Sequence, residues 1–439
     1  MNMINASLKS GILASFIAVS TAAPLSLAAS PDDKTFTIAV IPDTQNYLDY
    51  THQKAEGFPF DANKLFIEQM QYIADNLESQ GGDIAFVTSL GDVWQHQTLS
   101  MDEDHKARGF KIAPNPIVDS HFAPTEKAKT VEMPKAHEGF SLIAGKVPFS
   151  VAPGNHDYDA MWTDANHPPS ANPDPHDLAT LGMLHPGGLD NFRSVFGANS
   201  VFFKDKPWYV EYNDGGADSA QIFEAGGYRF LHIALQFDAP NASLEWAAGV
   251  VEKHPGLPTI VSTHAYLNTD GERKANPVID GHVVDPIHNN PEMVWQKFIS
   301  QHDQIFLVLC GHEHGQATRM DSNAHGNPVW QLLSDYQSRA QTAIDAGGKV
   351  ESGLGIGIGD GWMRFMEFDM SGKDPVVHVR TYSTHYDVQS TDHKEYAEWY
   401  KDHEQPHMTE AQFRSGDDFK LKLNGFSKRF ATKAALVNQ

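Results

Sequence analysis

Five short apolar runs, each closed by polar or turn-forming residues, are the clearest pattern along this chain. They predict buried strands, because a short unbroken apolar run is typical of a strand covered on both faces. The predicted strands span 36–41, 84–90, 147–152, 259–262 and 305–310. Between several of them, apolar residues recur at helical spacing over 65–77, 244–251 and 291–299. The alternation of strand and helix predicts a layered α/β fold.

Two stretches interrupt this alternation, and we interpret both as surface insertions. They span 95–146 and 158 to about 225, and the second is crowded with Pro, Asn, Asp and Gly around 166–175. Beyond residue 315 the pattern favours strands at 329–333, 362–368 and 376–381, which would complete a second sheet. We expect one elaborated domain over 35–391, followed by a polar and partly helical C-terminal extension over 392–439.

The first 29 residues have the layout of a secretory signal peptide. A single basic residue, Lys9, precedes an apolar run over 11–19, which is too short to span a bilayer, and small residues follow up to Ala29. We therefore expect cleavage after Ala28 or Ala29 and a periplasmic or extracellular protein. Cys310 is the only cysteine, so an intrachain disulfide is excluded. No later segment is apolar enough to predict a transmembrane span.

The composition is strongly acidic. The chain contains 33 Lys and Arg and 56 Asp and Glu, which gives a formal net charge of −23. This charge argues against binding of nucleic-acid polymers or anionic membranes through a basic face. The sequence does not predict an oligomeric state.

Metal-binding side chains follow directly after each of the five predicted buried strands. In chain order these segments are Asp43-Thr44-Gln45, Gly91-Asp92, Gly154-Asn155-His156-Asp157, Thr263-His264 and Gly311-His312-Glu313-His314. Taken singly, each could be a helix cap, a turn or a hydrogen-bonded histidine. All five occur in order behind apolar runs, and the carboxyl ends of strands in an open α/β sheet meet in one crevice. Carboxylate and imidazole together favour Zn²⁺, Mn²⁺ or Fe²⁺ over Ca²⁺ alone.

This ordered set resembles the motifs of the calcineurin-like metallophosphoesterase superfamily, which are Asp-x-His, Gly-Asp, Gly-Asn-His-Asp/Glu, a lone His and Gly-His-x-His. The resemblance runs from about residue 36 to 381 and includes the stretches 333–337 and 361–362. It implies a four-layer α/β/β/α sandwich of two mixed sheets flanked by helices. It also implies an exported phosphoesterase that cleaves a phosphomonoester or phosphodiester through two divalent metal ions, most often Mn, Zn or Fe and in some cases Ca.

The resemblance further implies which residues carry the reaction. One metal ion would be held by Asp43, Asp92 and His314, and the other by Asp92, Asn155, His264 and His312. Asp92 would bridge the two ions. His156 would protonate the leaving group or stabilise charge on the phosphoryl group, while a metal-activated hydroxide attacks phosphorus.

Gln45 departs from the superfamily pattern, which has His at this position. An amide oxygen can coordinate a metal, but it is a weaker donor than imidazole and favours harder ions. Gln45 is therefore expected to remain a ligand and to alter the identity or affinity of the first metal. Asp157 could orient His156 or cap a helix, and we favour the cap.

The chemistry also follows from physical reasoning. Two cations ~3.5–4 Å apart lower the pKa of a bridging water and neutralise phosphate oxygens. A strongly acidic protein needs such a local positive centre to attract a phosphate. A histidine such as His156 suits proton transfer because its pKa lies near neutrality.

Two alternatives stay open at this point. The chain could be a metal-stabilised binding protein that has the fold without turnover, with Gln45 as a sign of decay, or a narrow phosphodiesterase for lipid head groups or nucleotides. Retention of Asp92 and His156 argues against the binding protein. Further aromatic and polar residues near the motifs are hypothesised to line the substrate pocket: Trp94, His96, Tyr158 and Trp162. Other histidines are expected in solvated loops: His137, His167, His176, His185 and His325.

Overall fold

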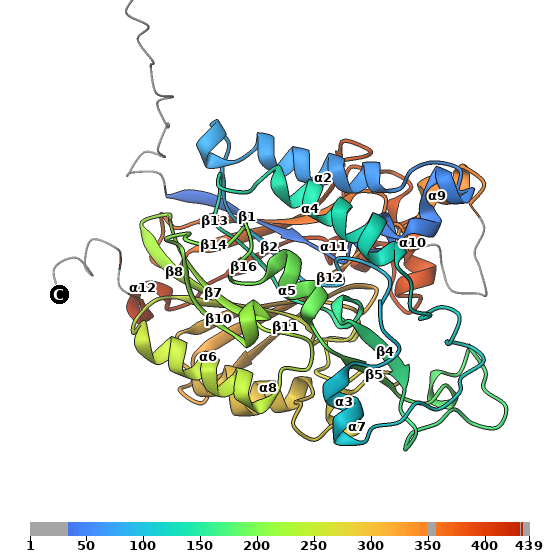
Figure 1. Ribbon diagram of the computed structural model, residues 1–439. Coiled ribbons are helices and arrows are strands. Elements are labelled where there is room, and N and C mark those ends of the chain that lie inside the picture. Colours follow the sequence, from blue (N-terminus) through green and yellow to red (C-terminus); the bar gives the residue numbers. More distant parts are fainter. Residues whose placement is uncertain (1–33, 349–356, 431, 433–439) are drawn as a thin grey trace, which may run out of the picture.

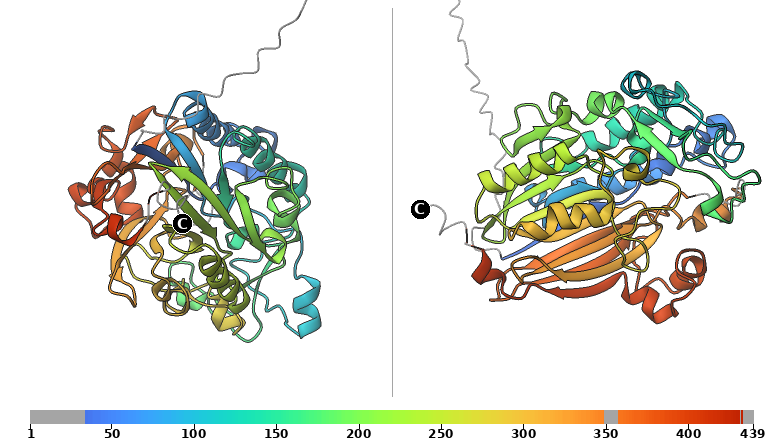
Figure 2. Two further views of the ribbon diagram at one scale, coloured as in Figure 1. Left: turned by 90° about the vertical axis from the view of Figure 1, so that its left-hand side faces the viewer. Right: turned by 90° about the horizontal axis from the view of Figure 1, so that it is seen from below.

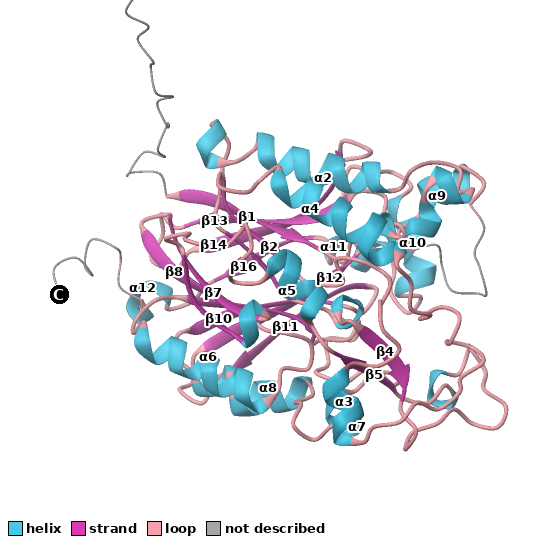
Figure 3. Cartoon of the chain, in the orientation of Figure 1, coloured by secondary structure: helices cyan, strands magenta, loops and turns pink. Residues whose placement is uncertain are grey.

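The chain forms two large mixed β-sheets flanked by helices in the computed structural model, which describes residues 34–348, 357–430 and 432 (Figures 1 and 3). The predicted signal peptide, residues 1–29, lies outside the described residues. All five predicted buried strands are confirmed, but they divide between the two sheets.

The first sheet contains the first three of these strands, which run parallel to one another. In spatial order its members are β15 (Val388–Gln389), β14 (Val376–Ser383), β13 (Trp362–Asp369), β1 (Thr35–Ile41), β2 (Ile84–Ser89) and β3 (Phe149–Val151), and β16 (Asp418–Lys422) also pairs with β14. The neighbouring strand β13 is antiparallel to β1. The predicted strands at 362–368 and 376–381 are confirmed, but their predicted place in a second sheet is wrong, because β13 pairs with β1 and both strands belong to the first sheet.

The second sheet contains the other two predicted buried strands, β9 and β10. Its order is β11 (Gly315–Ser322), β12 (Pro328–Asp335), β10 (Ile305–Gly311), β9 (Thr259–Ala265), β8 (Tyr228–Ala234), β7 (Asp218–Ala225) and β6 (Tyr209–Asn213). Strands β8, β9, β10 and β12 are parallel, while β11, β7 and β6 pair in antiparallel fashion. A separate hairpin joins β4 (Ala160–Thr163) to β5 (Leu184–Gly187).

Helices cover the outer face of each sheet. Figures 1 and 2 show α2 (Asn63–Asp75) and α4 (Met133–Ser141) against the first sheet, and α6 (Asn241–Lys253) and α8 (Pro291–Lys297) against the second. The remaining helices are α1 (Gln45–Leu48), α3 (Glu103–Arg108), α5 (Asp190–Phe196), α7 (Gly281–Val284), α9 (Gln341–Asp345), α10 (Tyr396–Glu404), α11 (Glu410–Ser415) and α12 (Phe426–Arg429). Among the described helices, none has the length and apolar character required to cross a bilayer.

Strand β1 explains why the buried strands have continuous apolar runs. Phe36 and Val40 point into the core between the two sheets, where Phe36 stacks on Phe368 with a centroid distance of 4.7 Å. Ala39 and Ile41 point to the opposite face of the strand and belong to the core under α2 and α4. Because consecutive side chains of a strand point to opposite faces, both faces of this strand require apolar residues.

The two predicted insertions contribute more to the fold than surface loops would. In the first, Phe140 of α4 is fully buried in the core under the first sheet, and in the second, Phe196 of α5 joins the same core. Strands β6 and β7 also lie inside the predicted second insertion, yet they form one edge of the second sheet. The sequence pattern missed β7 because polar side chains such as Ser219 and Gln221 are buried on it.

A buried ion-pair network fixes the C-terminal region to the sheets. Arg339, which follows β12 and has no exposed side-chain surface, lies 2.8 Å from Glu404 of α10 and 3.2 Å from Asp417. Asp417 also accepts a hydrogen bond from Arg364 of β13 at 2.9 Å. The polar extension after residue 391 is helical in part, as expected, and β16 adds a strand to the first sheet.

Arg339→Ala should lower the free energy of unfolding by about 3–5 kcal/mol, because it leaves Glu404 and Asp417 buried without their main cation. Urea unfolding followed by tryptophan fluorescence measures this change. The control Lys106→Ala removes an exposed ion pair with Glu103 and should cost less than about 1 kcal/mol. Equal unfolding free energies for the two variants would contradict this role of Arg339.

Candidate metal centre

The predicted metal-binding segments meet at the carboxyl ends of the strands, where the two sheets face each other. The amide of His312, after β10 of the second sheet, donates to Asp43 Oδ2 after β1 of the first sheet at 3.1 Å. His264 Nε2, on β9, lies 3.1 Å from Asp92 Oδ2 after β2. These contacts cross from one sheet to the other, so the ligand group lies between the two sheets.

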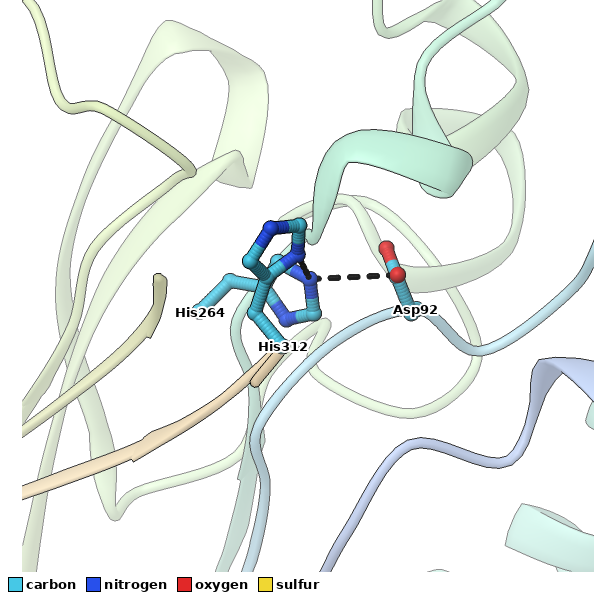
Figure 4. Close-up of side chains that lie close together, drawn as sticks. All are labelled: Asp92, His264 and His312. Atoms are coloured by element: carbon cyan, nitrogen blue, oxygen red, sulfur yellow. Dashed lines mark hydrogen bonds and ion pairs between the residues drawn. The ribbon is translucent and has the colours of Figure 1, made fainter. Parts of the chain in front are cut away.

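His264 lies at the centre of the cluster that Figure 4 shows. Its Nδ1 lies 2.9 Å from the carbonyl oxygen of Leu90. A carbonyl only accepts, so Nδ1 carries the proton and Nε2 of the neutral ring has a lone pair. Around Nε2 lie Asp92 Oδ2, Asn155 Oδ1 and His312 Nδ1, each 3.1 Å away. A lone pair surrounded by other acceptor atoms fits a cation in their midst.

The ionisation of these residues also favours a cation. Burial alone would raise the pKa of Asp92, but His264 and His156 lower it well below its ordinary value. Burial lowers the pKa of His312 to about 3, and the neighbouring His264 lowers it further. Asp92 is thus an anion and His312 a neutral imidazole, which are the forms that bind metal ions.

Asp43 and Gln45 form the second part of the site. Asp43 Oδ1 and Gln45 Oε1 are buried and have no hydrogen-bond partner among the described residues. Burial, together with the charges of Asp335 and Asp92, raises the pKa of Asp43 well above its ordinary value. Unpartnered oxygens beside crowded carboxylates fit a second cation, which would supply the missing positive charge.

Asp335 and Gln337 belong to this part of the site, although sequence reasoning did not select them. Gln45 Nε2 donates to Gln337 Oε1 at 2.9 Å, and Gln337 Nε2 donates to Asp335 Oδ2 at 3.2 Å. With its amide nitrogen held this way, Gln45 presents its oxygen as the unpartnered atom. The signal was present in the sequence, because Asp335 follows the predicted strand 329–333 just as Asp43 and Asp92 follow theirs.

His156 lies beside the cluster without joining it. Its Nδ1 lies 2.7 Å from the carbonyl oxygen of Gln95, and its amide donates to Asp92 Oδ1 at 2.8 Å. Burial lowers the pKa of His156, and Asp92 partly offsets this. Asp157 accepts from the amides of Gly154 and Val93 at 2.8 and 2.9 Å, which supports the cap that we favoured for this residue.

His314 is the predicted ligand that the structure separates from the central cluster. The close group of ligand atoms consists of Asp92, His264 and His312, while His314 is exposed and hydrogen-bonds through Nδ1 to the Ser338 hydroxyl. That hydrogen bond fixes the orientation of the ring. A hydrogen bond at one ring nitrogen is typical of a histidine that uses the other nitrogen to bind a metal.

Glycines in the motifs permit the close approach of the loops. A Cβ on Gly154 would lie 2.2 Å from Asp92 Oδ1, and one on Gly311 would lie 2.4 Å from Asp43 Oδ1. Gly91 has a φ of +99°, and a Cβ there would lie 2.5 Å from the amide nitrogen of Gly154. Any larger residue would displace the two carboxylates.

The residues hypothesised to line a pocket have other surroundings. Trp94 is 1% exposed and stacks near Phe196 in the core, and Trp162 packs against His185 with a centroid distance of 4.5 Å. The Tyr158 hydroxyl donates to Gln236 Oε1 at 3.3 Å. These side chains pack inside the protein and support the loops that carry the ligands.

His96 has a defined partner. Its Nδ1 lies 2.8 Å from Glu132 Oε1, and its amide donates to Glu132 Oε2 at 3.0 Å. Burial lowers the pKa of His96, but the hydrogen bond to Glu132 and the charges of Glu132 and Asp49 together raise it overall. This pair ties the segment before α4 to the loop that carries Asp92.

His185 corrects a sequence-based expectation. It was expected in a solvated loop, but it is only 1% exposed and lies on β5. Its neighbours are aromatic rings, which the loop-like composition of the surrounding sequence did not indicate. His137 is exposed as expected but lies on helix α4, so its predicted place in a loop is also wrong. His176 and His325 are exposed, and His167 is half-buried.

Gly154→Ala should weaken divalent-metal binding by roughly 10–100-fold, as for changes that misorient a ligand, because the new Cβ would displace Asp92. Titration calorimetry with Mn²⁺ on metal-stripped protein measures this. The control Gly249→Ala changes a position in α6 that has no heavy atom within 4 Å of the added Cβ. Equal affinity in Gly154→Ala and wild type would show that the close approach is unnecessary.

Comparisons with known proteins do not assign this chain. No protein-family model matches it, and no curated protein matches it either. The family resemblance of the motifs therefore stays an expectation, and the function has to be argued from the side chains themselves. The buried His and Asp groups at the junction of the sheets could hold metal ions.

Proposed function

We propose that this protein is a metal-dependent phosphoesterase that hydrolyses a phosphomonoester or phosphodiester of a small molecule. The observation that carries the proposal is the ring of acceptor atoms around His264 Nε2, with Asp92, Asn155 and His312 each contributing one atom at 3.1 Å. Such an arrangement between the two sheets suits one cation, and the unpartnered oxygens of Asp43 and Gln45 suit a second cation.

The ligands divide into two groups in this proposal. Asp92, Asn155, His264 and His312 would hold one divalent ion, and Asp43, Gln45, Asp92 and His314 the other, with Asp92 shared. When bound, a pair of divalent ions lowers the pKa of water and neutralises the oxygens of a phosphate. The protein's own contribution is to hold carboxylates and neutral imidazoles in place before the substrate arrives.

His156 would handle the proton of the leaving group. Its Nδ1 donates to the Gln95 carbonyl, so a proton on Nε2 makes the ring a cation. Burial disfavours that cation and Asp92 favours it. A phosphate anion in the crevice would add negative charge and favour the protonated form further, after which Nε2 can donate to the departing oxygen.

The architecture and the charge fit this proposal. Two large mixed sheets, with α2 and α4 outside one and α6 and α8 outside the other, are consistent with the layered sandwich that the motif resemblance implies. A net charge of −23 repels polyanions, so a small ester is the favoured substrate class. We also propose that the protein acts after export, as its N-terminal sequence predicts.

Asp92→Asn should reduce hydrolysis to background, because it removes the shared anionic ligand. The assay uses metal-stripped protein reloaded with Mn²⁺, Zn²⁺, Fe²⁺ or Ca²⁺, with nitrophenyl phosphate and bis-nitrophenyl phosphate as substrates. Asp75→Asn, an exposed acid on α2, is the matched control and should keep full activity. Bound metal without turnover of either ester would favour the binding-protein alternative.

His156→Gln should slow cleavage of an alkyl phosphate by roughly 10²–10⁴-fold, the usual contribution of a general acid. Nitrophenyl phosphate should be affected much less, because nitrophenolate leaves without a proton. Steady-state kcat for both esters measures the difference. An equal loss for both would assign charge stabilisation to His156 and contradict its role as the acid.

A further inference from the structure

A second group of metal-binding side chains lies apart from the sheet junction, among α3, the β4–β5 hairpin and the turn after α7. His105 of α3, His185 of β5 and Asp285 each offer one ligand atom, and these atoms lie within 4.8 Å of one another. Figure 1 shows α3, α7 and the hairpin as neighbours. We propose that these three residues bind a divalent transition-metal ion of the Zn²⁺ class, which holds the hairpin to the second sheet's loops.

The first support is the state of the imidazole nitrogens. His105 Nε2 and both ring nitrogens of His185 are buried and have no hydrogen-bond partner among the described residues. The side chains of His105, His185 and Asp285 are 7%, 1% and 2% exposed. An unpaired buried polar atom costs on the order of 1–3 kcal/mol, so unpaired nitrogens on two neighbouring rings call for a common partner, and a metal ion bound by one nitrogen of each ring supplies one.

The second support is the orientation of His105. Its Nδ1 lies 2.7 Å from Asp102 Oδ2, and its amide donates to Asp102 Oδ1 at 3.1 Å. A carboxylate that accepts from Nδ1–H leaves a lone pair on Nε2 and raises its basicity, which is the usual arrangement behind a zinc-binding histidine. The unpartnered nitrogen is thus the one that is electronically prepared to coordinate.

The backbone of the β4–β5 hairpin packs closely against this carboxylate–imidazole pair. A Cβ on Gly187 of β5 would lie 2.2 Å from Asp102 Oδ2 and 2.8 Å from His105 Nδ1. Glycine at this position therefore allows the hairpin to lie directly on the pair. Asp164 Oδ2, also buried and unpartnered, lies 3.6 Å from His185 Nδ1 and could support that ring in the same way.

The surroundings fit an ion that joins these segments. The rings of Phe110 and Trp162 lie 4.7 and 4.5 Å from the ring of His185, which gives the site an apolar wall. Arg108 donates to Asp285, and a carboxylate has enough lone pairs to accept this bond and to coordinate. Two imidazoles and one carboxylate, with water in the fourth position, fit Zn²⁺.

The decisive variant is His185→Phe, which keeps an aromatic ring in the apolar wall and removes the nitrogens. It is made in the Asp92→Asn background of the full chain, so that the sheet junction contributes little metal. Co²⁺ is titrated into the metal-stripped proteins and the visible d–d bands are recorded. We expect tetrahedral Co²⁺ bands from one equivalent in Asp92→Asn alone and their loss with His185→Phe.

Controls and a second measurement keep the proposal falsifiable. His176→Phe in the same background changes an exposed histidine and should leave the bands intact. Bands that persist in His185→Phe would overturn the site. If His185→Phe does not fold, zinc-edge anomalous diffraction from wild-type crystals decides: a peak between His105 and His185 supports the site, and no peak there overturns it. The result does not depend on the proposed phosphoesterase activity.

Discussion

The structure depends on the burial of several carboxylates at one place. Asp43, Asp92 and Asp335 come from the ends of three strands, and each is at most 1% exposed. Like charges this close repel one another strongly in a medium of low dielectric. Within the described residues the amide of His312 and the Gln337 side chain offset part of that cost. A cation at this place would offset the remainder, and the second sheet brings imidazoles to the same edge that could hold one.

The loops at this edge accept backbone strain to place their ligands. Asp92 and His312 both have positive φ, at 49° and 72°, which is uncommon for residues other than glycine. Both residues belong to the central ligand group. Strained residues that also supply the ligand atoms are typical of functional sites, where the surrounding structure over-determines the conformation.

Carboxylate–imidazole pairs hold the long connections in place. Glu132 and His96 join the segment before α4 to the Asp92 loop, and the Asp102–His105 pair at the start of α3 packs against the β4–β5 hairpin. Buried acids in these connections thus have two distinct uses. One orients a loop around the proposed catalytic crevice, and the other supports a ring whose far nitrogen is free for a metal.

The sequence by itself determined the five buried strands and the ligand candidates that follow them. Apolar runs located the strands that became β1, β2, β3, β9 and β10, because burial on both faces leaves a continuous signal. The residues after those runs supplied Asp43, Asp92 and His264 as ligand candidates. Local pattern is sufficient for such predictions, since strand length and the residue that follows are properties of the chain alone.

Only the tertiary structure decided which strands share a sheet and what surrounds each ligand. The division of the five strands between two sheets depends on long-range pairing, which local pattern does not encode. The hydrogen bond between Gln337 and Gln45 could be recognised only in the folded structure, where β12 lies beside the loops of the first sheet. His185 was predicted to lie in a loop, but in the folded chain it is surrounded by the rings of His105, Phe110 and Trp162. Burial and partners arise from contacts between distant residues, and these exist only in the folded chain.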